Sequence, residues 1–178
     1  MNLPNKITIF RACMIPVFLL FYLWDGIPYH NVIALAVFII ACLSDALDGH
    51  LARKYQLVTN FGKFMDPLAD KLLVCTALLC FLDAGTIPLL VVVTIIAREF
   101  IISGFRLVAS DAGVVVAASY WGKFKTATQM IMCVLLILHL NYTWYNLLEN
   151  IFIWVSFALT VISLLDYLVK NKSVLNTK

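Results

Sequence analysis

The sequence DALDGHLARKYQLVTNFGKFMDPLAD, residues 45–70, determines how the rest of this chain is interpreted. It places four aspartates in a chain that is 63% hydrophobic. Asp45 and Asp48 are three residues apart, and Asp66 and Asp70 are four residues apart. Residues with these separations lie on the same face of an α-helix. The segment therefore predicts two helices that each present a pair of carboxylates.

The composition of the whole chain indicates a membrane protein. Of its 178 residues, 63% are hydrophobic and 13% are charged, whereas soluble domains have roughly 45–50% apolar and about 25% charged residues. At about 20 residues for each membrane-spanning helix, the chain has room for roughly six spans. We therefore expect an all-α integral membrane protein, with six transmembrane helices in one bundle and a single domain over residues 1–178.

Turn residues divide the apolar sequence into six expected helices. They cover approximately residues 8–24, 31–54, 62–82, 87–110, 123–139 and 148–169. The second helix is expected to continue from an apolar half into the polar Asp45–Lys54 segment, because no proline interrupts it. The first apolar stretch has no small-residue cleavage site, so we expect it to remain in the protein. The five cysteines lie inside apolar runs and are interpreted as small core residues.

The distribution of positive charge predicts the orientation in the membrane. None of the 13 lysines and arginines lies in the turns expected after the first, third and fifth helices. Basic residues are enriched in the cytoplasmic segments of membrane proteins, so both termini are expected in the cytosol. The protein would then lie in the cell membrane (the inner, or cytoplasmic, membrane), surrounded by membrane lipids, with its active site facing the cytosol. No nucleic acid is expected as a partner.

The two aspartate pairs are expected at similar depths in the membrane. Asp45 lies 14 residues after Asn31, which corresponds to about 21 Å of helix. Asp70 lies 13 residues before Asp83, which corresponds to about 20 Å. Both pairs are therefore expected in the cytoplasmic half of the membrane.

Four aspartates at this depth point to bound cations, since each costs about 2.5–3.5 kcal/mol at the centre of a spanning helix. Salt bridges to Arg53 and Lys71 are the structural alternative. Oxygen ligands without histidine or cysteine suit magnesium or manganese, and two such ions can assist phosphoryl transfer. Gly49 and Gly62 leave room for a ligand near the backbone, while the guanidinium of Arg53 suits phosphate. These residues favour two divalent cations, Mg²⁺ or Mn²⁺, and a nucleotide diphosphate between the helices.

The same residues carry a resemblance to a known family. Asp45-x-x-Asp48-Gly49-x-x-Ala52-Arg53, followed after eight residues by Gly62-x-x-x-Asp66-x-x-x-Asp70, resembles the complete signature of the CDP-alcohol phosphatidyltransferases. The resemblance implies a six-helix membrane enzyme, usually a homodimer. It also implies transfer of a phosphatidyl group from CDP-diacylglycerol to an alcohol, with release of CMP.

The resemblance also assigns roles to the motif residues. It implies that Asp45, Asp48 and Asp66 hold one metal ion, and that Asp45, Asp66 and Asp70 hold the second. Asp70 would also be the catalytic general base, which takes the proton from the acceptor hydroxyl as this group attacks the β-phosphorus. The residues that would bind the cytidine diphosphate part of CDP-diacylglycerol are Asp48, Gly49, Ala52, Arg53 and Gly62.

Cations outside the motif predict the acceptor alcohol. Arg11, Arg106, Lys123 and Lys125 are expected near the depth of the site, where they would bind the phosphate of an anionic acceptor. The alternative is the basic fringe that is common at cytosolic helix ends. The stretches around these cations resemble the bacterial phosphatidylglycerophosphate synthase branch of the family. That resemblance implies sn-glycerol 3-phosphate as the acceptor and phosphatidylglycerol phosphate as the product.

Two kinds of alternative fit the same residues. Another family member, such as a cardiolipin synthase or an enzyme with an inositol phosphate acceptor, would carry the same aspartates. A divalent-cation transporter would also use intramembrane carboxylates, although the outer half of this chain offers only Asp25, Asp83 and Glu149. Arg98 lies some 16 Å into its helix, where it needs a partner such as a carboxylate from another helix, and it is expected to be structural or to support the site residues. Its neighbour Glu99 is expected to point elsewhere.

Overall fold

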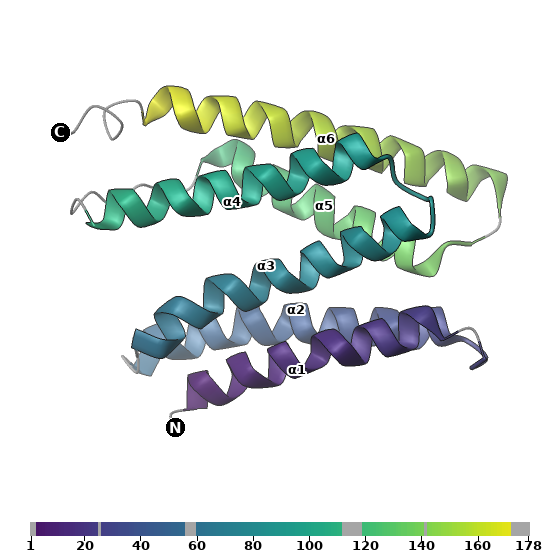
Figure 1. Ribbon diagram of the computed structural model, residues 1–178, viewed down its shortest axis with the longest axis horizontal. Helices are drawn as coiled ribbons and strands as arrows, with labels where there is room; N and C mark the ends of the chain where they lie inside the picture. The colour runs from purple at the N-terminus through teal and green to yellow at the C-terminus, as the bar shows by residue number, and fades with distance from the viewer. Residues whose placement is uncertain (1–2, 25, 56–59, 112–118, 141, 172–178) are drawn as a thin grey trace. The chain divides into compact units, whose positions relative to one another are not determined.

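The computed structural model describes residues 3–24, 26–55, 60–111, 119–140 and 142–171. Within these ranges, the side chains of residues 3–8, 45–55, 60–70 and 110–111 lie outside the description. The described residues form six α-helices and no strand, which confirms the all-α prediction. The helices labelled in Figure 1 are α1 (Leu3–Leu23), α2 (His30–Tyr55), α3 (Asn60–Asp83), α4 (Leu89–Asp111), α5 (Tyr120–Leu138) and α6 (Thr143–Lys170).

The boundaries of α2 and α1 confirm one prediction and correct another. α2 runs without a break to Tyr55, so the polar segment 45–54 continues the apolar half of the helix, as expected. α1 begins at Leu3, whereas the sequence predicted a start near Thr8. A proline such as Pro4 is tolerated in the first turn of a helix, because its missing N–H would have no partner there. The polar segment that was expected to precede the first helix is therefore part of it.

α6 also begins earlier than expected. Its first residue is Thr143, whereas the sequence predicted a polar and aromatic link there and a helix from about Leu148. Tyr145 and Glu149 are four residues apart and both are buried, so they extend the buried face of α6 by one turn. The hydroxyl of Tyr145 also donates to the backbone oxygen of Leu135 in α5, at 2.9 Å. The other helix boundaries lie within three residues of the prediction.

Two compact units make up the chain. Unit 1 comprises Met1–Asp83 and Ile137–His139, and unit 2 comprises Ala84–Leu136 and Leu140–Lys178. Unit 1 therefore contains α1, α2 and α3, while unit 2 contains α4, α6 and nearly all of α5. The single domain over residues 1–178 stays a prediction.

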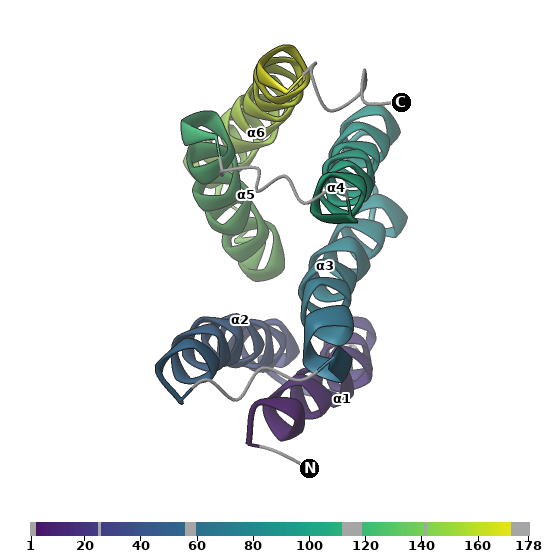
Figure 2. The same ribbon diagram turned by 90° about the vertical axis from the view of Figure 1, so that its left-hand side faces the viewer.

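In unit 1, α1 packs against both α2 and α3, which also contact each other. The three helices lie side by side in both Figure 1 and Figure 2. The ring centroid of Phe18 on α1 lies 5.9 Å from that of Phe38 on α2. Tyr22 on α1 lies 5.9 Å from Phe81 on α3. Each such pair adds about 0.5–1.5 kcal/mol to the gain from burial, so this cluster holds the two aspartate-bearing helices against α1.

In unit 2, α6 has an inverted pattern of polarity. Its buried face consists mostly of residues that can form hydrogen bonds: Tyr145, Glu149, Ile153, Ser156, Thr160, Ser163 and Tyr167. Its exposed face carries large apolar residues: Trp144, Leu147, Ile151, Trp154, Val155, Ile162, Leu165 and Val169. A helix in water buries its apolar face and exposes its polar face. The exposed face of α6 therefore suits lipid better than water.

Within the described residues, α6 is the one helix that is both long and apolar enough to cross a membrane. Its 28 residues give a length of about 42 Å, which exceeds the hydrocarbon core of about 30 Å. Ile9–Leu23 and His30–Ser44 are shorter apolar helical stretches. Large apolar side chains are also exposed on the other helices, for example Leu20, Ile40 and Leu79. The six spans and the cytosolic termini stay predictions.

Candidate active site

The aspartate motif lies on two neighbouring helices of unit 1. Its first half lies on α2 and its second half on α3. Both halves are continuous helix, so the two aspartates of each pair occupy the same face of their helix by register. The side chains of the whole motif lie outside the described residues, namely Asp45, Asp48, Gly49, Ala52, Arg53, Gly62, Asp66 and Asp70. Their roles in catalysis, metal binding and CDP-diacylglycerol binding stay predictions.

The chemistry of this donor set fits divalent cations. α2 and α3 contact each other and both contact α1, so the two aspartate pairs belong to one packed group of helices. Four carboxylates provide the oxygen ligands that Mg²⁺ and Mn²⁺ prefer. Among the side chains that the structure describes, no group of three or more histidines, cysteines, aspartates or glutamates is placed to bind a metal. The four aspartates of the motif are not among those side chains.

Arg11 is a buried cation of unit 1. It lies on α1, and 1% of its surface is exposed. A guanidinium carries five N–H donors and is always charged, so its burial requires hydrogen-bond acceptors or negative charge around it. Because α1 packs against α2 and α3, Arg11 belongs to the same unit as the aspartate motif. Its role in binding the acceptor phosphate stays a prediction.

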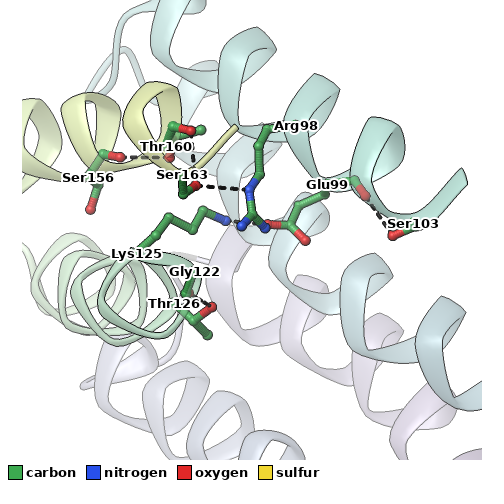
Figure 3. A network of polar contacts seen from close by, with 9 residues as sticks. All are labelled: Arg98, Glu99, Ser103, Gly122, Lys125, Thr126, Ser156, Thr160 and Ser163. Carbon is green, nitrogen blue, oxygen red and sulfur yellow. Dashed lines mark hydrogen bonds and ion pairs between the residues drawn. The ribbon is translucent and has the colours of Figure 1, made fainter. Parts of the chain in front are cut away.

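A network of charged and hydroxyl side chains connects the three helices of unit 2 (Figure 3). Arg98 of α4 donates from Nε to Ser163 Oγ on α6, at 3.2 Å. The Nη1 atom of Arg98 lies 3.1 Å from Glu99 Oε1. Lys125 of α5 donates from Nζ to the same oxygen of Glu99. Glu99 therefore joins α4 to α5, and Arg98 joins α4 to α6.

This network is largely shielded from solvent. The exposed fractions of the side chains are 10% for Arg98, 2% for Lys125 and 20% for Glu99. Charges attract more strongly in such surroundings than in water, and removal of one partner leaves the other charge buried and uncompensated. The two cations and one carboxylate give these three side chains a net charge of +1. The network therefore favours a negatively charged ligand.

Small and hydroxyl-bearing residues of α5 and α6 surround the Arg98 side chain. A Cβ atom added to Gly122 on α5 would lie 3.4 Å from Arg98 Nη2, which is ordinary van der Waals contact, so α5 packs close to the guanidinium at this position. On α6, Ser163 Oγ donates to the backbone oxygen of Thr160 at 3.1 Å. The hydroxyl of Thr160 in turn donates to the backbone oxygen of Ser156 at 2.6 Å. The bond from Ser163 to Thr160 orients the Ser163 hydroxyl so that its oxygen accepts from Arg98.

The prediction for Glu99 was wrong. Neighbours in sequence do not face each other on a helix, and this rule led to the expectation that Glu99 points away from Arg98. The two side chains form an ion pair instead, since both are long enough to bend toward each other and Lys125 lies beside them. The carboxylate partner of Arg98 thus comes from its own helix, while its partner on another helix is the hydroxyl of Ser163.

Arg106 and Lys123 differ from Lys125 because both are exposed. The guanidinium carbon of Arg106 lies 5.9 Å from the ring centroid of Tyr167 on α6. The ammonium of Lys123 lies 5.8 Å from the ring centroid of Tyr120. Cation–π contacts at exposed positions contribute only about 0.5–1 kcal/mol, so either cation can turn toward a soluble anion. Their roles, and that of Lys125, in binding the acceptor phosphate stay predictions.

A second polar contact in unit 2 was missed by the sequence reasoning, as was the part played by Ser163. Asp166 of α6 accepts from Ser119 Oγ at 2.5 Å and forms an ion pair with Lys170 at 2.7 Å. The backbone oxygen of Ser119 accepts from the N–H of Gly122 in the first turn of α5. Ser119 and Asp166 therefore tie the start of α5 to α6. They are 47 residues apart, so no local spacing signals the contact.

A family model described as CDP-alcohol phosphatidyltransferase matches residues 1–162 of this chain. The matched range contains both halves of the aspartate motif. It also contains the buried network cations Arg98 and Lys125 and the exposed cations Arg106 and Lys123. The similarity is therefore not confined to the short motif, and it extends across most of both units.

Curated proteins from several bacteria are similar to this chain over nearly its full length. A protein of Bacillus subtilis (strain 168) named CDP-diacylglycerol–glycerol-3-phosphate 3-phosphatidyltransferase is 42% identical, over 99% of this chain and 98% of that protein. A protein of the same name from Rickettsia bellii is 38% identical, over 93% of each chain. A third, from Haemophilus influenzae, is 37% identical over 94% of this chain and 91% of that protein.

Proposed function

We propose that this chain, which belongs to the CDP-alcohol phosphatidyltransferase family, transfers a phosphatidyl group from CDP-diacylglycerol to sn-glycerol 3-phosphate. The products are phosphatidylglycerol phosphate and CMP, so the enzyme acts in phospholipid biosynthesis. The observation that carries this conclusion is the near full-length similarity to the Bacillus subtilis protein named for this reaction, at 42% identity. The two other relatives described above carry the same name.

The two aspartate-bearing helices supply the transfer chemistry in this proposal. Asp45, Asp48 and Asp66 would hold one Mg²⁺ or Mn²⁺ ion, and Asp45, Asp66 and Asp70 would hold the second. When bound, these ions neutralise the negative charge of the pyrophosphate and of the leaving CMP. Asp70 accepts the proton of the acceptor hydroxyl as its oxygen attacks the β-phosphorus. The continuous helix through each aspartate pair supports this arrangement.

Residues near the first aspartate pair bind the cytidine diphosphate part of the donor. Gly49 and Gly62 have no side chain, so a nucleotide can approach the backbone of α2 and α3 closely. The guanidinium of Arg53 can donate two parallel hydrogen bonds to a phosphate. Asp48 and Ala52 complete this set on α2.

Four cations bind the phosphate of the acceptor in this proposal: Arg11, Arg106, Lys123 and Lys125. Arg106 and Lys123 are exposed and can attract a soluble anion, while Arg11 and Lys125 are each 1% exposed. Buried charges act more strongly on a bound anion because the local dielectric is lower. The net positive charge of the network around Lys125 supports an anionic acceptor.

The enzyme lies in the cell membrane, and α6 supports a spanning orientation. Tyr142 and Trp144 stack at the start of α6, with ring centroids 6.3 Å apart. Lys170 lies in the last turn at its other end. Aromatic residues gather at both membrane interfaces and basic residues on the cytosolic side. We therefore place the Lys170 end of α6 toward the cytosol.

The number of spans, the cytosolic termini and the cytosolic active site are inferred from the positions of the basic residues, and the homodimer is inferred from the family. Six spans with both termini in the cytosol agree with the absence of basic residues from the turns expected after the first, third and fifth helices. The active site then opens to the cytosol, from which the water-soluble acceptor sn-glycerol 3-phosphate can reach it. The membrane is the cytoplasmic (inner) one. The family resemblance supports a homodimer.

Reconstitution tests the proposed reaction. Purified protein in lipid vesicles, supplied with CDP-diacylglycerol, sn-glycerol 3-phosphate and Mg²⁺ or Mn²⁺, should release CMP and form phosphatidylglycerol phosphate in equal amounts. Mass spectrometry identifies the lipid and chromatography measures the CMP. Flux of divalent cations through the vesicles without CMP formation would contradict the proposal and favour a transporter.

A further inference from the structure

We infer that Glu99 is a positioning residue for acceptor binding, which holds the ammonium of Lys125 in one place through a direct ion pair. This inference rests on the proposed function, in which Lys125 binds the acceptor phosphate. The proposed function gives roles to the aspartate motif and to four cations but none to Glu99, so this role is additional.

The geometry of Lys125 shows why a positioning residue is needed. A lysine side chain has four flexible carbon–carbon bonds and ends in a point charge, so the sequence position alone does not fix where the ammonium lies. Here the side chain is 2% exposed and the ammonium donates to Glu99 Oε1. An ammonium has three N–H donors, so one bond to Glu99 leaves two donors to engage a phosphate.

Glu99 is itself held by a second cation. Arg98 Nη1 donates to the same Oε1 atom at 3.1 Å, and Arg98 Nε donates to Ser163 on α6. Gly122 lies one turn before Lys125 on α5, and its backbone lies close to the guanidinium. Glu99 Oε1 therefore contacts two cations, Arg98 from α4 and Lys125 from α5, and Arg98 also donates to Ser163 of α6 (Figure 3).

The charge of the network fits this role. Two cations share one carboxylate, so one positive charge stays uncompensated among these three side chains. Such a charge is unfavourable in a shielded site, and a phosphate group removes the imbalance. Glu99 thus lowers the cost of burying two cations in the empty enzyme while leaving the net positive charge that attracts the acceptor.

A double-mutant cycle tests the inference. The variants are Glu99→Gln, which keeps the size of the side chain and removes its charge, Lys125→Met, and the combination of both. The acceptor KM, the CDP-diacylglycerol KM and kcat are measured for each by CMP release. Turnover of sn-glycerol 3-phosphate by the unaltered enzyme is measured first, because its absence would be a failure of the proposed function and not of this inference.

Each single variant is expected to raise the acceptor KM by about tenfold or more, the loss expected for a hydrogen bond to a charged group. Lys125→Met removes the ammonium, and Glu99→Gln no longer holds it in one place by an ion pair. The CDP-diacylglycerol KM and kcat should stay within about twofold, as expected when uniform binding of one substrate is lost. In the Lys125→Met background, Glu99→Gln should add no more than about twofold, because the effects of two residues that act through one shared contact are not additive.

Three outcomes would overturn the inference. In the first, Glu99→Gln leaves the acceptor KM unchanged or lowers it. In the second, it raises the acceptor KM equally with and without Lys125, so its effect does not pass through that residue. In the third, it raises both KM values together, as general damage to the fold would.

Two further variants keep the test decisive if Glu99→Gln does not fold. Glu99→Asp retains the charge but shortens the side chain, so its acceptor KM should lie between those of the unaltered enzyme and Lys125→Met, with the donor KM unchanged. An unaltered acceptor KM in Glu99→Asp would then overturn the inference. Asp166→Asn is the matched control, because Asp166 also bonds to a serine and a lysine in unit 2 and should leave both KM values unchanged.

Discussion

Unit 1 carries a cluster of acidic residues in its sequence motif, whereas unit 2 carries a network with more cations than acids. Unit 1 bears four aspartates on α2 and α3, which suit divalent cations and the pyrophosphate of a nucleotide-activated lipid. Unit 2 buries Arg98 and Lys125 around the single carboxylate of Glu99, which suits an anion. In the proposed function, the acids carry the transfer reaction, while the cations select the acceptor. Substitutions of the motif aspartates and of the acceptor-binding cations should therefore change different kinetic constants.

The largest effect is expected from Asp70→Asn in unit 1. This substitution keeps the size of the side chain but removes the proposed proton acceptor, so kcat should fall by about 10³-fold. Binding of labelled CDP-diacylglycerol should persist. Asp83→Asn changes an exposed aspartate at the end of the same helix and should retain activity. Near-normal turnover in Asp70→Asn would remove Asp70 as the general base.

Removal of divalent cations is expected to have the next largest effect. Chelation with EDTA should lower CMP release by at least about 10²-fold, since a missing electrostatic stabiliser of the leaving group has an effect of this size. Addition of Mg²⁺ or Mn²⁺ should restore the rate. Lys125→Met should show the same metal requirement as the unaltered enzyme, because Lys125 lies on α5 and is not one of the proposed metal ligands. Full activity in EDTA would contradict metal binding by the aspartates.

Arg106→Ala should raise the acceptor KM by about tenfold, the loss expected for a hydrogen bond to a charged group. The CDP-diacylglycerol KM should not change. Steady-state CMP release with each substrate varied in turn measures both constants. Lys170→Ala is the control, since Lys170 is also an exposed cation of unit 2 but pairs with Asp166. Equal increases in both KM values would refute a role for Arg106 that is specific to the acceptor.

The smallest effect is expected from Ser163→Ala. This variant removes the acceptor for Arg98 Nε and should lower the free energy of unfolding by about 1 kcal/mol. Thermal unfolding in detergent measures the change. Ser103→Ala is a control, because Ser103 Oγ bonds only within α4 in the contacts described, to the backbone oxygen of Glu99 at 2.6 Å. A loss in Ser103→Ala as large as that in Ser163→Ala would argue against a special contribution from the contact between α4 and α6.

The sequence predicted those features that depend on neighbours along the chain. The spacing of Asp45 and Asp48 and the lack of a helix breaker predicted a long second helix, and α2 confirms it. Family membership followed from the same short motif. Four cations in separate segments suggested an acceptor site, but their spacing could not show that Lys125 is buried while Lys123, two residues away, is exposed.

Contacts between distant residues were beyond such reasoning. Arg98 and Ser163 are 65 residues apart, and Glu99 and Lys125 are 26 apart. Nothing in the local pattern pairs them, because the pairing depends on how α4, α5 and α6 pack. The rule that adjacent helix residues diverge even gave the wrong direction for Glu99, since it neglects the length and flexibility of the side chains. The same limit applies to α6, whose start was predicted too late because its buried face is polar.

The acceptor specificity of the unaltered enzyme tests the central claim most directly. CMP release is measured with CDP-diacylglycerol and, in turn, sn-glycerol 3-phosphate, phosphatidylglycerol and inositol phosphate, and kcat/KM is compared for the three acceptors. We predict the highest value for sn-glycerol 3-phosphate. A higher kcat/KM with phosphatidylglycerol or inositol phosphate would contradict the claim that the cations of this chain select glycerol 3-phosphate.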